Sequence, residues 1–420
     1  MTTYAYDALR RLSRVTDALG QNTVYAYNET GGLSSQTDAN GHATRFEYDE
    51  LGRRVKTVLP LGNSSTTRYG DDGNMISTTD FNRDTITFEY DARDRLIAKR
   101  FPDTTSVEFT YTLTGQRASV TDARGVTTYT YDTRDRLKSR TDPDGVSISY
   151  TYDASGNRTS LTIPSGTITF AFDSLNRLAI VTDPDAASTS YQYDTVGNLI
   201  RTHLANGTVE TRDYDELNRL RLLENKAPGN SIINSFTYEL DSVGNRTSVT
   251  EHDGHRVEYQ YDELYRLIGE HIFNPGANMA TRTIGYTYDP VGNRLTRDNS
   301  AEGLTAYNHD ANDRLLEETL TTVANDVVRT TYTYDDNGNT LSKTTNGTDR
   351  VFYDWDFENR MNAVDTNGDG TNDVQYQYDA DGLRVSSIVN GVETGFLIDT
   401  NRPFTQVLEE YTPGGVITVS

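Results

Sequence analysis

The stretch Thr127–Leu137 reads TTYTYDTRDRL, and its alternation of aromatic residues with threonine decides the local structure. Tyr129 and Tyr131 lie on one side of an extended chain and the threonines on the other, which is the period-two pattern of a half-buried β-strand. Aromatic and β-branched residues are enriched in such strands. The stretch therefore predicts a strand that ends at Asp132.

The residues after this strand predict a tight turn. Asp132 can accept hydrogen bonds from the main chain of a turn that it opens. Asp135, three positions later, is one of the residue types, with Gly and Asn, that tolerate a positive φ. We expect a type I turn closed by a left-handed residue, after which Arg136 and Leu137 begin a return strand.

The same pattern recurs along nearly the whole chain, with an anchor residue after each second aromatic. The eighteen anchors are Asp7, Asn28, Asp49, Gly70, Asp91, Thr112, Asp132, Asp153, Asp173, Asp194, Asp215, Asp241, Asp262, Asp289, Asp310, Asp335, Asp356 and Asp379. Most steps between anchors are 20 or 21 residues. A fixed period in this range marks stacked units that bury a face only against their neighbours.

The position three residues after the anchor is Gly, Asn or Asp in all but two repeats. The exceptions are Arg10 and Tyr265, whose turns we expect to be the least regular. A second turn, as in residues 121–125 and 141–145, leads to the next aromatic strand. One repeat is thus two antiparallel strands and two turns.

The predicted fold is all-β, a repetitive ribbon of antiparallel β-hairpins with thirty-six strands. Open twisted sheets rarely exceed about 10 strands without curling, so we expect the ribbon to coil. Coiling would place aromatics of successive hairpins above one another, and we expect these aromatic ladders to be the main stabiliser. The excess of Tyr over Phe, 28 to 13, suits a single-layer wall, because a hydroxyl can reach a polar partner while its ring packs.

Composition excludes several classes of protein. The formal net charge of -23 disfavours a nucleic-acid partner, since such affinity comes largely from Lys and Arg. The chain has no Cys, hence no disulfide framework and no thiolate metal site. No apolar run approaches the roughly 20 residues of a membrane span. The chain opens inside a repeat, without a segment typical of a signal peptide, and we expect it to be a piece of a longer polypeptide.

Residues 286–295 read YTYDPVGNRL, a pattern that resembles the YD repeat of the RHS (rearrangement hotspot) family. This family includes the shell components of bacterial insecticidal toxin complexes and the YD shell of teneurins. The resemblance covers residues 1–411. The residues identified with the structural repeat are Tyr129, Tyr131, Asp132, Tyr286, Tyr288, Asp289, Gly292 and Arg294.

The resemblance implies a ribbon that spirals into a hollow shell, an open or partial cocoon. In bacterial members the cocoon encloses a C-terminal polymorphic toxin, and a core with a DPxGxxxG-like motif closes the shell, where Asp residues cut the toxin free. This chain ends at Val419-Ser420 before such a core, and Asp289–Gly292 mimics only the opening of the motif, in repeat register. We therefore expect a repeat array over residues 1–394, a lead-in toward a missing core over residues 395–420, and no toxin or autoproteolytic residue.

One stretch resembles a calcium-binding loop. Asp365, Asn367, Asp369 and Asp373 occupy positions 1, 3, 5 and 9 of such a loop, with Gly at position 6. Position 12 is Tyr376, so the closing bidentate Glu is missing and affinity should be weak. The alternative interpretation is a longer polar hairpin turn, and no other cofactor is expected.

Other candidate sites have simpler explanations. His252 and His255 lie close in sequence but lack a third ligand, so a turn is the better interpretation. The many Asp residues could suggest a paired-carboxylate hydrolase, but they follow the turn register, whereas catalytic groups should break it. We therefore expect no enzyme. Four longer steps place insertions at residues 224–234, 271–282, 318–329 and 365–373, which are either contact regions or tolerated length variation.

Our leading hypothesis from sequence is a non-enzymatic scaffold, part of a secreted or cell-surface bacterial shell that encloses or presents a C-terminal toxin. Its partners would be a toxin domain or the remaining shell sequence. The alternative is a cell-surface adhesion or carbohydrate-binding module, because Tyr-rich surfaces can stack on sugar rings or contact surface proteins. We expect neither a nucleic-acid partner nor a transmembrane segment.

Overall fold

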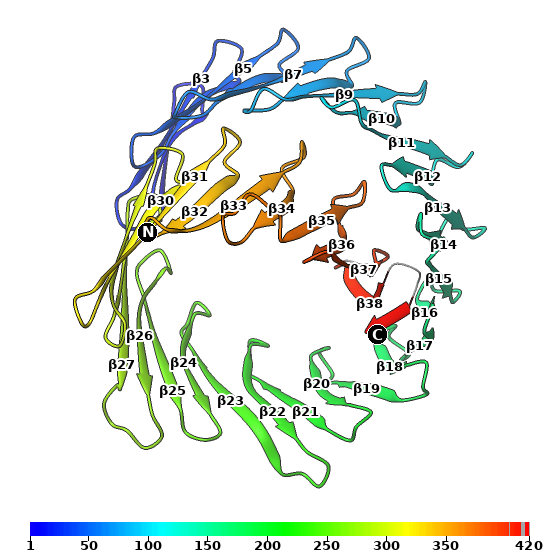
Figure 1. The fold of residues 1–420 in the computed structure, drawn as a ribbon. Helices are drawn as coiled ribbons and strands as arrows, with labels where there is room; N and C mark the ends of the chain where they lie inside the picture. Colours follow the sequence, from blue (N-terminus) through cyan, green and yellow to red (C-terminus); the bar gives the residue numbers. More distant parts are fainter. Residues whose placement is uncertain (403, 413–415, 420) are drawn as a thin grey trace. The chain divides into compact units, whose positions relative to one another are not determined.

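The computed structural model describes residues 1–402, 404–412 and 416–419, and the described chain is all-β. Thirty-nine strands form one antiparallel sheet in which the strands follow one another along the chain (Figure 1). The predicted lead-in over residues 395–420 falls partly outside the described residues, at 403, 413–415 and 420. The described part holds no helix of the length and apolarity that a membrane span requires.

The first thirty-six strands form eighteen hairpins, one around each anchor, and three more strands follow them. The strands are β1 (Thr3–Tyr6), β2 (Leu12–Thr16), β3 (Asn22–Tyr27), β4 (Leu33–Thr37), β5 (Ala43–Tyr48), β6 (Arg54–Val58), β7 (Ser64–Tyr69), β8 (Met75–Thr79), β9 (Thr85–Tyr90), β10 (Leu96–Arg100), β11 (Ser106–Tyr111), β12 (Arg117–Asp122), β13 (Gly125–Tyr131), β14 (Leu137–Thr141), β15 (Ser147–Tyr152), β16 (Arg158–Ile163), β17 (Gly166–Phe172), β18 (Leu178–Thr182), β19 (Ser188–Tyr193), β20 (Leu199–His203), β21 (Val209–Tyr214), β22 (Leu220–Lys226), β23 (Ile232–Leu240), β24 (Arg246–Glu251), β25 (Arg256–Tyr261), β26 (Leu267–Phe273), β27 (Arg282–Tyr288), β28 (Arg294–Asn299), β29 (Gly303–His309), β30 (Leu315–Thr322), β31 (Val327–Tyr334), β32 (Thr340–Thr345), β33 (Asp349–Trp355), β34 (Met361–Asp365), β35 (Val374–Tyr378), β36 (Arg384–Val389), β37 (Val392–Asp399), β38 (Gln406–Thr412) and β39 (Val416–Val419).

The anchor residue builds the turn as the sequence predicts. Asp132 Oδ1 accepts hydrogen bonds from the main-chain nitrogens of Arg134 and Arg136, at 2.8 and 3.0 Å. The Asp132 nitrogen in turn donates to the Arg136 carbonyl, and the Asp135 nitrogen donates to the Asp132 carbonyl. The carboxylate thus satisfies main-chain donors of the turn, and a bulge at Tyr131 passes the chain into β14.

The residue three positions after the anchor has a positive φ in every one of the eighteen repeats, which confirms the predicted turn type. Arg10 and Tyr265 adopt φ of 64° and 61°, with the same closing hydrogen bonds as the Gly and Asn residues in this position. The expectation that these two turns would be irregular is therefore wrong. The hydrogen bonds of Asp7 and Asp262 hold the turn geometry, so that the backbone of Arg10 and Tyr265 stays in the left-handed region despite the strain.

The residue four positions after the anchor, here called the bridging residue, links one repeat to the next. Arg136 pairs with Asp132 through Nε at 2.7 Å, and its Nη1 donates to the Asp153 carbonyl of the next repeat at 3.0 Å. Its guanidinium also lies 4.5 Å from the centre of the Tyr152 ring. The Tyr152 hydroxyl donates to the Leu137 carbonyl at 2.7 Å, so the hydroxyl of Tyr152 and the guanidinium of Arg136 both have hydrogen-bond partners.

This contact recurs along the chain and changes the expected stabiliser. Guanidinium groups lie 4.5 to 4.6 Å from the ring of the following repeat in the pairs Arg11–Tyr27, Arg53–Tyr69, Arg95–Tyr111 and Arg177–Tyr193. At Asn157, where the bridging residue is Asn, the side-chain amide donates to the left-handed residue of the next turn, Asn176, at 2.9 Å. The recurring ladder is therefore one of rings and guanidinium groups, and the expectation of aromatic-on-aromatic ladders is wrong.

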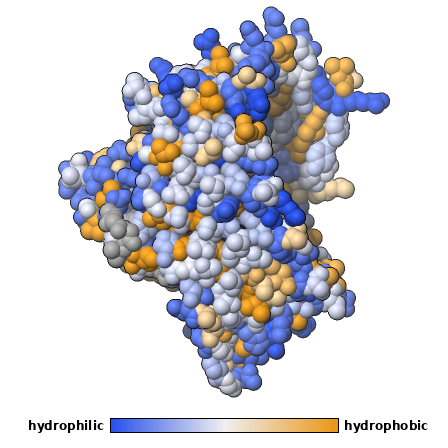
Figure 2. All heavy atoms as spheres, turned by 90° about the vertical axis from the view of Figure 1, so that its right-hand side faces the viewer, coloured by the Kyte–Doolittle hydropathy of each residue, from blue (hydrophilic) through white to orange (hydrophobic). Residues whose placement is uncertain are grey.

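Burial is modest, as a single-layer sheet requires. Ile148, Tyr150 and Leu161 are among the few almost completely buried side chains. Most strand residues are only half-buried, and the aromatic residues of β1 are exposed. On the face drawn in Figure 2, apolar residues occur in small groups among hydrophilic and intermediate ones. Hydrogen bonds and ring contacts between repeats consequently carry much of the cohesion.

The chain divides into two compact units, which are considered separately. Unit 1 comprises Met1–Val126, Gly285–Ile398 and Val407–Val419, and unit 2 comprises Thr127–Ile284 and Asp399–Gln406. Unit 1 thus contains two runs of hairpins that are far apart in the sequence. Unit 2 contains one run together with a short segment that follows β37.

The two runs of unit 1 lie side by side and are bonded through their turns, along a line here called the seam. Most of the bonds join a return turn of the first run to an anchor turn of the second run, in consecutive order, and the bonded residues are 249 to 264 positions apart. Lys99 in β10 and Arg117 at the start of β12 reach the anchor turns of the second run from within strands. The bonds are Asn40 Nδ2 to Asp289 Oδ2 (2.8 Å), Leu61 N to Asn312 Oδ1 (3.3 Å), Asn82 Nδ2 to Asp335 Oδ2 (2.9 Å), Asn337 Nδ2 to Asp80 Oδ2 (2.6 Å), Lys99 Nζ to Glu358 Oε1 (2.9 Å) and Arg117 Nη1 to Asp381 Oδ2 (2.7 Å). The rings of Phe101 and Phe357 stack beside them at 6.4 Å.

The four insertions all lie at the return-turn edge of the ribbon. Two of them, residues 224–234 and 318–329, mainly lengthen strands, so that β30 and β31 have eight residues each. Residues 271–282 form an eight-residue connection between β26 and β27, and residues 365–373 form a loop between β34 and β35. The inserted residues in the second run of unit 1 therefore extend the edge opposite the anchor turns, and the seam keeps its register.

Replacing Tyr265 with Gly should stabilise the protein. Tyr265 is 60% exposed and has a φ of 61°, so the substitution removes strain without removing a buried side chain. Because left-handed strain costs about 1–2 kcal/mol and glycine flexibility about 0.5–1 kcal/mol, we expect a gain of roughly 0.5–1 kcal/mol in unfolding free energy. Urea unfolding measures this difference.

Tyr265→Ala is the matched control, since it removes the ring but keeps a Cβ atom on a residue with a positive φ. We expect its stability to stay close to that of the parent protein. A loss of stability in Tyr265→Gly greater than that in Tyr265→Ala would contradict the strain assigned to this turn.

Candidate functional site

The repeat residues singled out from the sequence lie in strands and turns of the ribbon. Tyr286 and Tyr288 belong to β27, and Arg294 at the start of β28 lies 4.4 Å from the centre of the Tyr307 ring. Asp289 opens an ordinary anchor turn that Gly292 closes with a φ of 102°. The resemblance of Asp289–Gly292 to the start of the core motif is thus a feature of the repeat, as the register indicates.

Asp289 has a second role that the sequence does not reveal. Its Oδ2 accepts one hydrogen bond from the bridging residue Asn293, at 3.0 Å, and another from Asn40 across the seam, at 2.8 Å. Burial acts to raise the pKa of Asp289, but the hydrogen bonds from Asn40, Asn293 and the turn hold it below its usual range. One carboxylate therefore serves both its own turn and the neighbouring run.

Most anchor carboxyls share this electrostatic state. Their pKa lies below the usual Asp value because turn nitrogens and the bridging residue bond the charged form, which outweighs the opposing effect of burial. These anchors are Asp7, Asp49, Asp91, Asp132, Asp153, Asp173, Asp194, Asp215, Asp241, Asp262, Asp289 and Asp310. The side-chain hydrogen bond from Arg95 is the largest cause at Asp91, where the pKa falls to about 2. Asp379 is the opposite case, since burial raises its pKa.

The loop at residues 365–373 turns its carboxylates toward its own main chain. Asp365 accepts from the nitrogens of Gly368 and Gly370, at 2.7 and 2.8 Å, and Asp369 accepts from Thr371. Asn367 Oδ1 accepts from Asp369, and Asp373 accepts from Thr366. These bonds are those of a polar hairpin turn, while the weak calcium site at Asp365, Asn367, Asp369 and Asp373 stays a prediction.

The pair His252 and His255 lies in a return turn, as the sequence favours. The Gly254 nitrogen donates to the Glu251 carbonyl, and the His255 ring nitrogen lies 2.8 Å from Asp253. A different group gathers at the seam of unit 1: Asp38, His42 and Asp313 are the His and carboxylate side chains that converge among the described residues. No sequence spacing indicates this group, because Asp313 lies in the other run.

Unit 2 contains a buried ionic cluster that holds Asp399, the last residue of β37, and the residues after it against β15 to β17. We call Tyr150, Arg158, Asp399, Asn401 and Arg402 the clamp. Asp399 is completely buried, and its Oδ2 lies 2.6 Å from Arg158 Nη1 and 3.2 Å from Arg402 Nε. Its Oδ1 accepts from the Tyr150 hydroxyl at 2.9 Å and from the Asn401 nitrogen at 3.0 Å.

Aromatic groups surround the charges of the clamp. The guanidinium of Arg158 lies 4.9 Å from the Phe170 ring centre, and that of Arg402 lies 5.5 Å from the same ring. Burial, followed by repulsion from Arg158, lowers the pKa of Arg402, and burial raises the pKa of Tyr150. Two cations on one carboxylate in an apolar setting make Asp399 the residue on which the cluster depends.

The sequence does not single out the clamp. Arg158 stands directly after a bridging residue, in a register position that holds Leu in nine of the eighteen repeats and Arg in six. Arg158 and Arg117 both stand in this position and reach carboxylates far along the chain, Asp399 and Asp381. A buried guanidinium requires a partner to offset its desolvation, but the sequence says neither which of the six is buried nor which Asp is its partner.

Comparison with known families confirms the type of repeat. Residues 74–273 match the teneurin YD-shell family, and residues 27–64 match the RHS repeat family. The resemblance to the YD and RHS repeat family, predicted from the anchor pattern, is therefore shown for these residues.

Solved structures of toxin-complex shells have the same fold. The TcdB2-TccC3 structure without its hypervariable C-terminal region is similar to 98% of this chain, with a TM-score of 0.70 and 15% identity. The TcdB2-TccC3-TEV structure is similar to 97% of the chain, with a TM-score of 0.67 and 18% identity. The Tc holotoxin pore of Photorhabdus luminescens gives a TM-score of 0.66 at 17% identity over 98% of the chain. This chain spans 26 to 27% of those chains, and the likeness shows the fold alone.

A curated relative is more similar in sequence over a shorter stretch. The tRNA nuclease WapA of Bacillus subtilis is 33% identical to this chain over 116 residues. The aligned stretch is 28% of this chain and 4% of the relative. The nuclease activity in the name is that of the whole relative, of which this chain spans a small part.

The anchor carboxyls should make stability depend on acidity below about pH 4. An Asp with a lowered folded-state pKa contributes stability that is present above its unfolded pKa and lost as pH falls through the folded value. The unfolded value is 3.8 and Asp91 lies at about 2, so stability should fall progressively between about pH 4 and pH 2. The raised pKa of Asp379 has the opposite effect on stability, but the twelve anchors whose pKa is lowered outweigh it. Melting temperatures at pH 7, 4, 3 and 2 test the expectation, and constant values below pH 4 would contradict it.

Replacing Asp399 with Asn should destabilise the protein strongly. The amide keeps the shape of the carboxylate but leaves the largely buried guanidinium of Arg158 and the partly exposed one of Arg402 without their anion. Removing one partner of a buried ion pair typically costs about 3–5 kcal/mol. Urea unfolding of the full chain measures the loss of unfolding free energy.

Asp213→Asn is the control for this experiment, because Asp213 pairs with Arg221 at the surface, where both side chains are more than half exposed. We expect its cost to stay below about 1 kcal/mol. The combined variant Arg158→Met with Asp399→Leu should recover part of the loss, and equal small losses for Asp399→Asn and Asp213→Asn would refute the clamp.

Proposed function

We propose that this chain is a non-enzymatic stretch of shell wall. The observation that carries the proposal is the seam of unit 1, where consecutive turns of two runs bond to one another in register. A ribbon whose edges bond to itself makes a continuous surface from a single layer of strands. Such a surface separates two compartments, which is the property that a container requires.

The seam has the chemistry of a permanent contact. Asn82 Oδ1 accepts from the nitrogens of Asp336 and Asn337, while Asn337 Oδ1 accepts from those of Phe81 and Asn82. Each Asn thus bonds the main chain of the opposite turn, and main-chain groups of both edges are satisfied. This reciprocal arrangement supports a role in wall construction.

The proposed cargo is a toxin domain, and the proposed partners are that domain or further shell sequence. The support is the fold shared with TcdB2-TccC3 structures together with the family of the repeats. We also propose a secreted or cell-surface location on the same basis. The glycan-binding alternative receives no support from the comparisons, and the rings of the second aromatics are largely covered by guanidinium groups.

The proposed division of the chain is a repeat array over residues 1–394 followed by a lead-in over residues 395–420. The clamp supports the second part, since it fastens residues 399–402 to hairpins about 240 residues earlier. A segment held in this way can direct the chain that follows it. The role of the lead-in is therefore to set the exit of the chain from the array.

Limited proteolysis of the protein in its natural length tests the shell. We expect a C-terminal segment downstream of the array to resist a protease that digests the same segment when it is expressed alone. Asn82→Ala combined with Asn337→Ala should open the seam and increase the digestion rate of that segment.

Asn206→Ala is the matched control, because the Asn206 oxygen accepts only a bond of its own turn among the interactions described, from Thr208. We expect it to leave the digestion rate unchanged. Equal digestion of the segment with and without the array would show that the array encloses no cargo.

A further inference from the structure

The return turn at Asp38–His42 has the main-chain bonds of an anchor turn, but the side chain four positions after its Asp does not bond the carboxylate. In the anchor turns of Asp7, Asp49 and Asp132, the Arg in that position lies 2.7 Å from the second carboxylate oxygen. In this turn the first oxygen of Asp38 accepts the usual bonds from Asn40 and His42, at 2.9 and 2.8 Å. The second oxygen, however, lies 3.7 Å from His42 Nδ1, too far for a hydrogen bond.

His42 therefore has an orphaned ring nitrogen. Nδ1 is shielded from solvent and makes no hydrogen bond. A buried nitrogen without a partner is costly, because it has lost its water and gained nothing in return. Its position, aimed at carboxylate oxygens, is one that a bound cation would satisfy.

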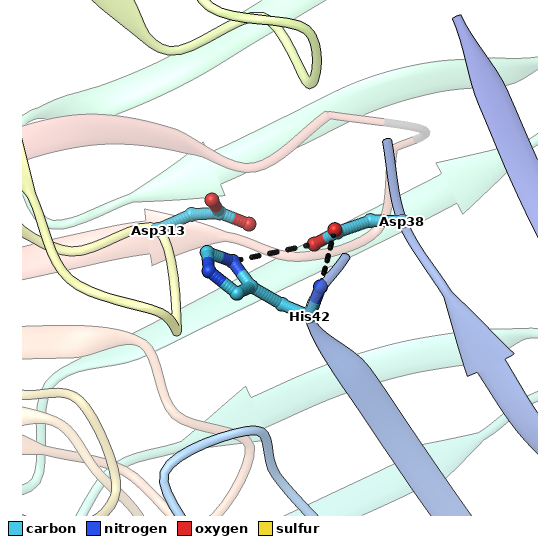
Figure 3. A group of neighbouring side chains, drawn as sticks. All are labelled: Asp38, His42 and Asp313. Atoms are coloured by element: carbon cyan, nitrogen blue, oxygen red, sulfur yellow. Dashed lines mark hydrogen bonds and ion pairs between the residues drawn. The ribbon is translucent and has the colours of Figure 1, made fainter. Parts of the chain in front are cut away.

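The third group comes from the second run of unit 1, across the seam. Asp313 is the left-handed residue of the anchor turn that Asp310 opens. One of its oxygens accepts from Asn293 at 2.7 Å. Ligand atoms of Asp38, His42 and Asp313 lie within 4.8 Å of one another, and in Figure 3 the two carboxylates point toward each other beside the imidazole ring.

The surroundings leave room for an ion and its waters. Asp38 and Asp313 line a cavity of about 220 Å³ at the seam, together with Pro60 and Asn337. Arg314 also lines this cavity, but its guanidinium is bound to Asp310 at 2.7 Å and to the Asp335 carbonyl at 2.9 Å. Two carboxylates and one imidazole thus converge, and within the described part of the chain no Lys or Arg forms an ion pair with Asp38 or Asp313.

We propose that Asp38, His42 and Asp313 form a zinc-type divalent metal site that staples the two runs of unit 1 together. One nitrogen and two carboxylate oxygens are a ligand set that Zn²⁺ accepts in tetrahedral geometry, with a fourth position for water. Bonds of about 2.0–2.2 Å require the ligand atoms to close to roughly 3.5 Å, which rotation of these partly exposed side chains supplies. Calcium fits less well, because it prefers six to eight oxygen ligands.

The metal is a structural crosslink that strengthens the wall at the seam. Asp38 and His42 belong to one run and Asp313 to the other, 271 residues after His42. Binding to the assembled seam and not to the unfolded chain adds the binding free energy to the stability of the fold. The site deepens the proposed shell role, but the binding measurement below does not depend on any cargo.

Metal titration of the full chain tests the site. After treatment with EDTA and dialysis, calorimetry with ZnCl₂ should show one site per chain, and the melting temperature should rise with Zn²⁺. His42→Gln and Asp313→Asn should each weaken Zn²⁺ binding at least about tenfold, since loss of even an outer-shell partner costs 10–100-fold. Co²⁺ should give a visible absorption band in the parent protein that both variants lose.

His255→Gln is the matched control, because His255 also follows a return-turn Asp but lies 2.8 Å from Asp253 and has no third ligand among the described residues. It should bind Zn²⁺ like the parent protein. Asp313→Asn keeps a residue type that tolerates a positive φ, so it separates metal binding from folding. The site would be overturned if the parent protein bound no Zn²⁺, or if His42→Gln and Asp313→Asn bound Zn²⁺ as tightly as the parent protein does. A failure of the cargo-protection experiment with intact Zn²⁺ binding would reject the shell role alone.

Discussion

The bridging residue, four positions after each anchor, provides the interaction on which the fold depends. In the repeat of Asp132, the side chain of Arg136 completes its own turn, bonds the main chain of the next turn and covers the next aromatic ring. Without it the hairpins would meet only through main-chain ladders and half-buried side chains. A sheet one layer thick has little apolar burial to draw on, so contacts of this kind decide whether neighbouring hairpins stay in register.

The anchor carboxylate makes that interaction reproducible. Because its oxygens bond two turn nitrogens and the bridging residue, the turn keeps one geometry even where the closing residue is Arg10 or Tyr265. A constant turn gives constant spacing between repeats. The turns of the two runs in unit 1 consequently meet one after another along the seam, although the second run contains a longer step between Asp310 and Asp335.

The division between local and long-range chemistry runs through the same residue types. Asp132 bonds the turn of its own repeat, whereas Asp289 also bonds Asn40 across the seam. Arg136 bridges neighbours, whereas Arg158 reaches the buried carboxylate of Asp399. The same residue type thus makes local contacts in one repeat and long-range contacts in another, and its surroundings in the folded chain decide which.

The sequence by itself determined the strands, the turn type, the single-layer ribbon and the family of the repeats, because these follow from short-range patterns such as Tyr129 to Asp135. The sequence also located the four insertions in the longer steps between anchors. It did not determine which carboxylate pairs with Arg158, which turns meet at the seam, or that Asp38, His42 and Asp313 converge. Those contacts join residues about 240 to 271 positions apart. They depend on the curvature and twist that the ribbon accumulates over many repeats, and a pattern within one repeat does not determine this total curvature and twist.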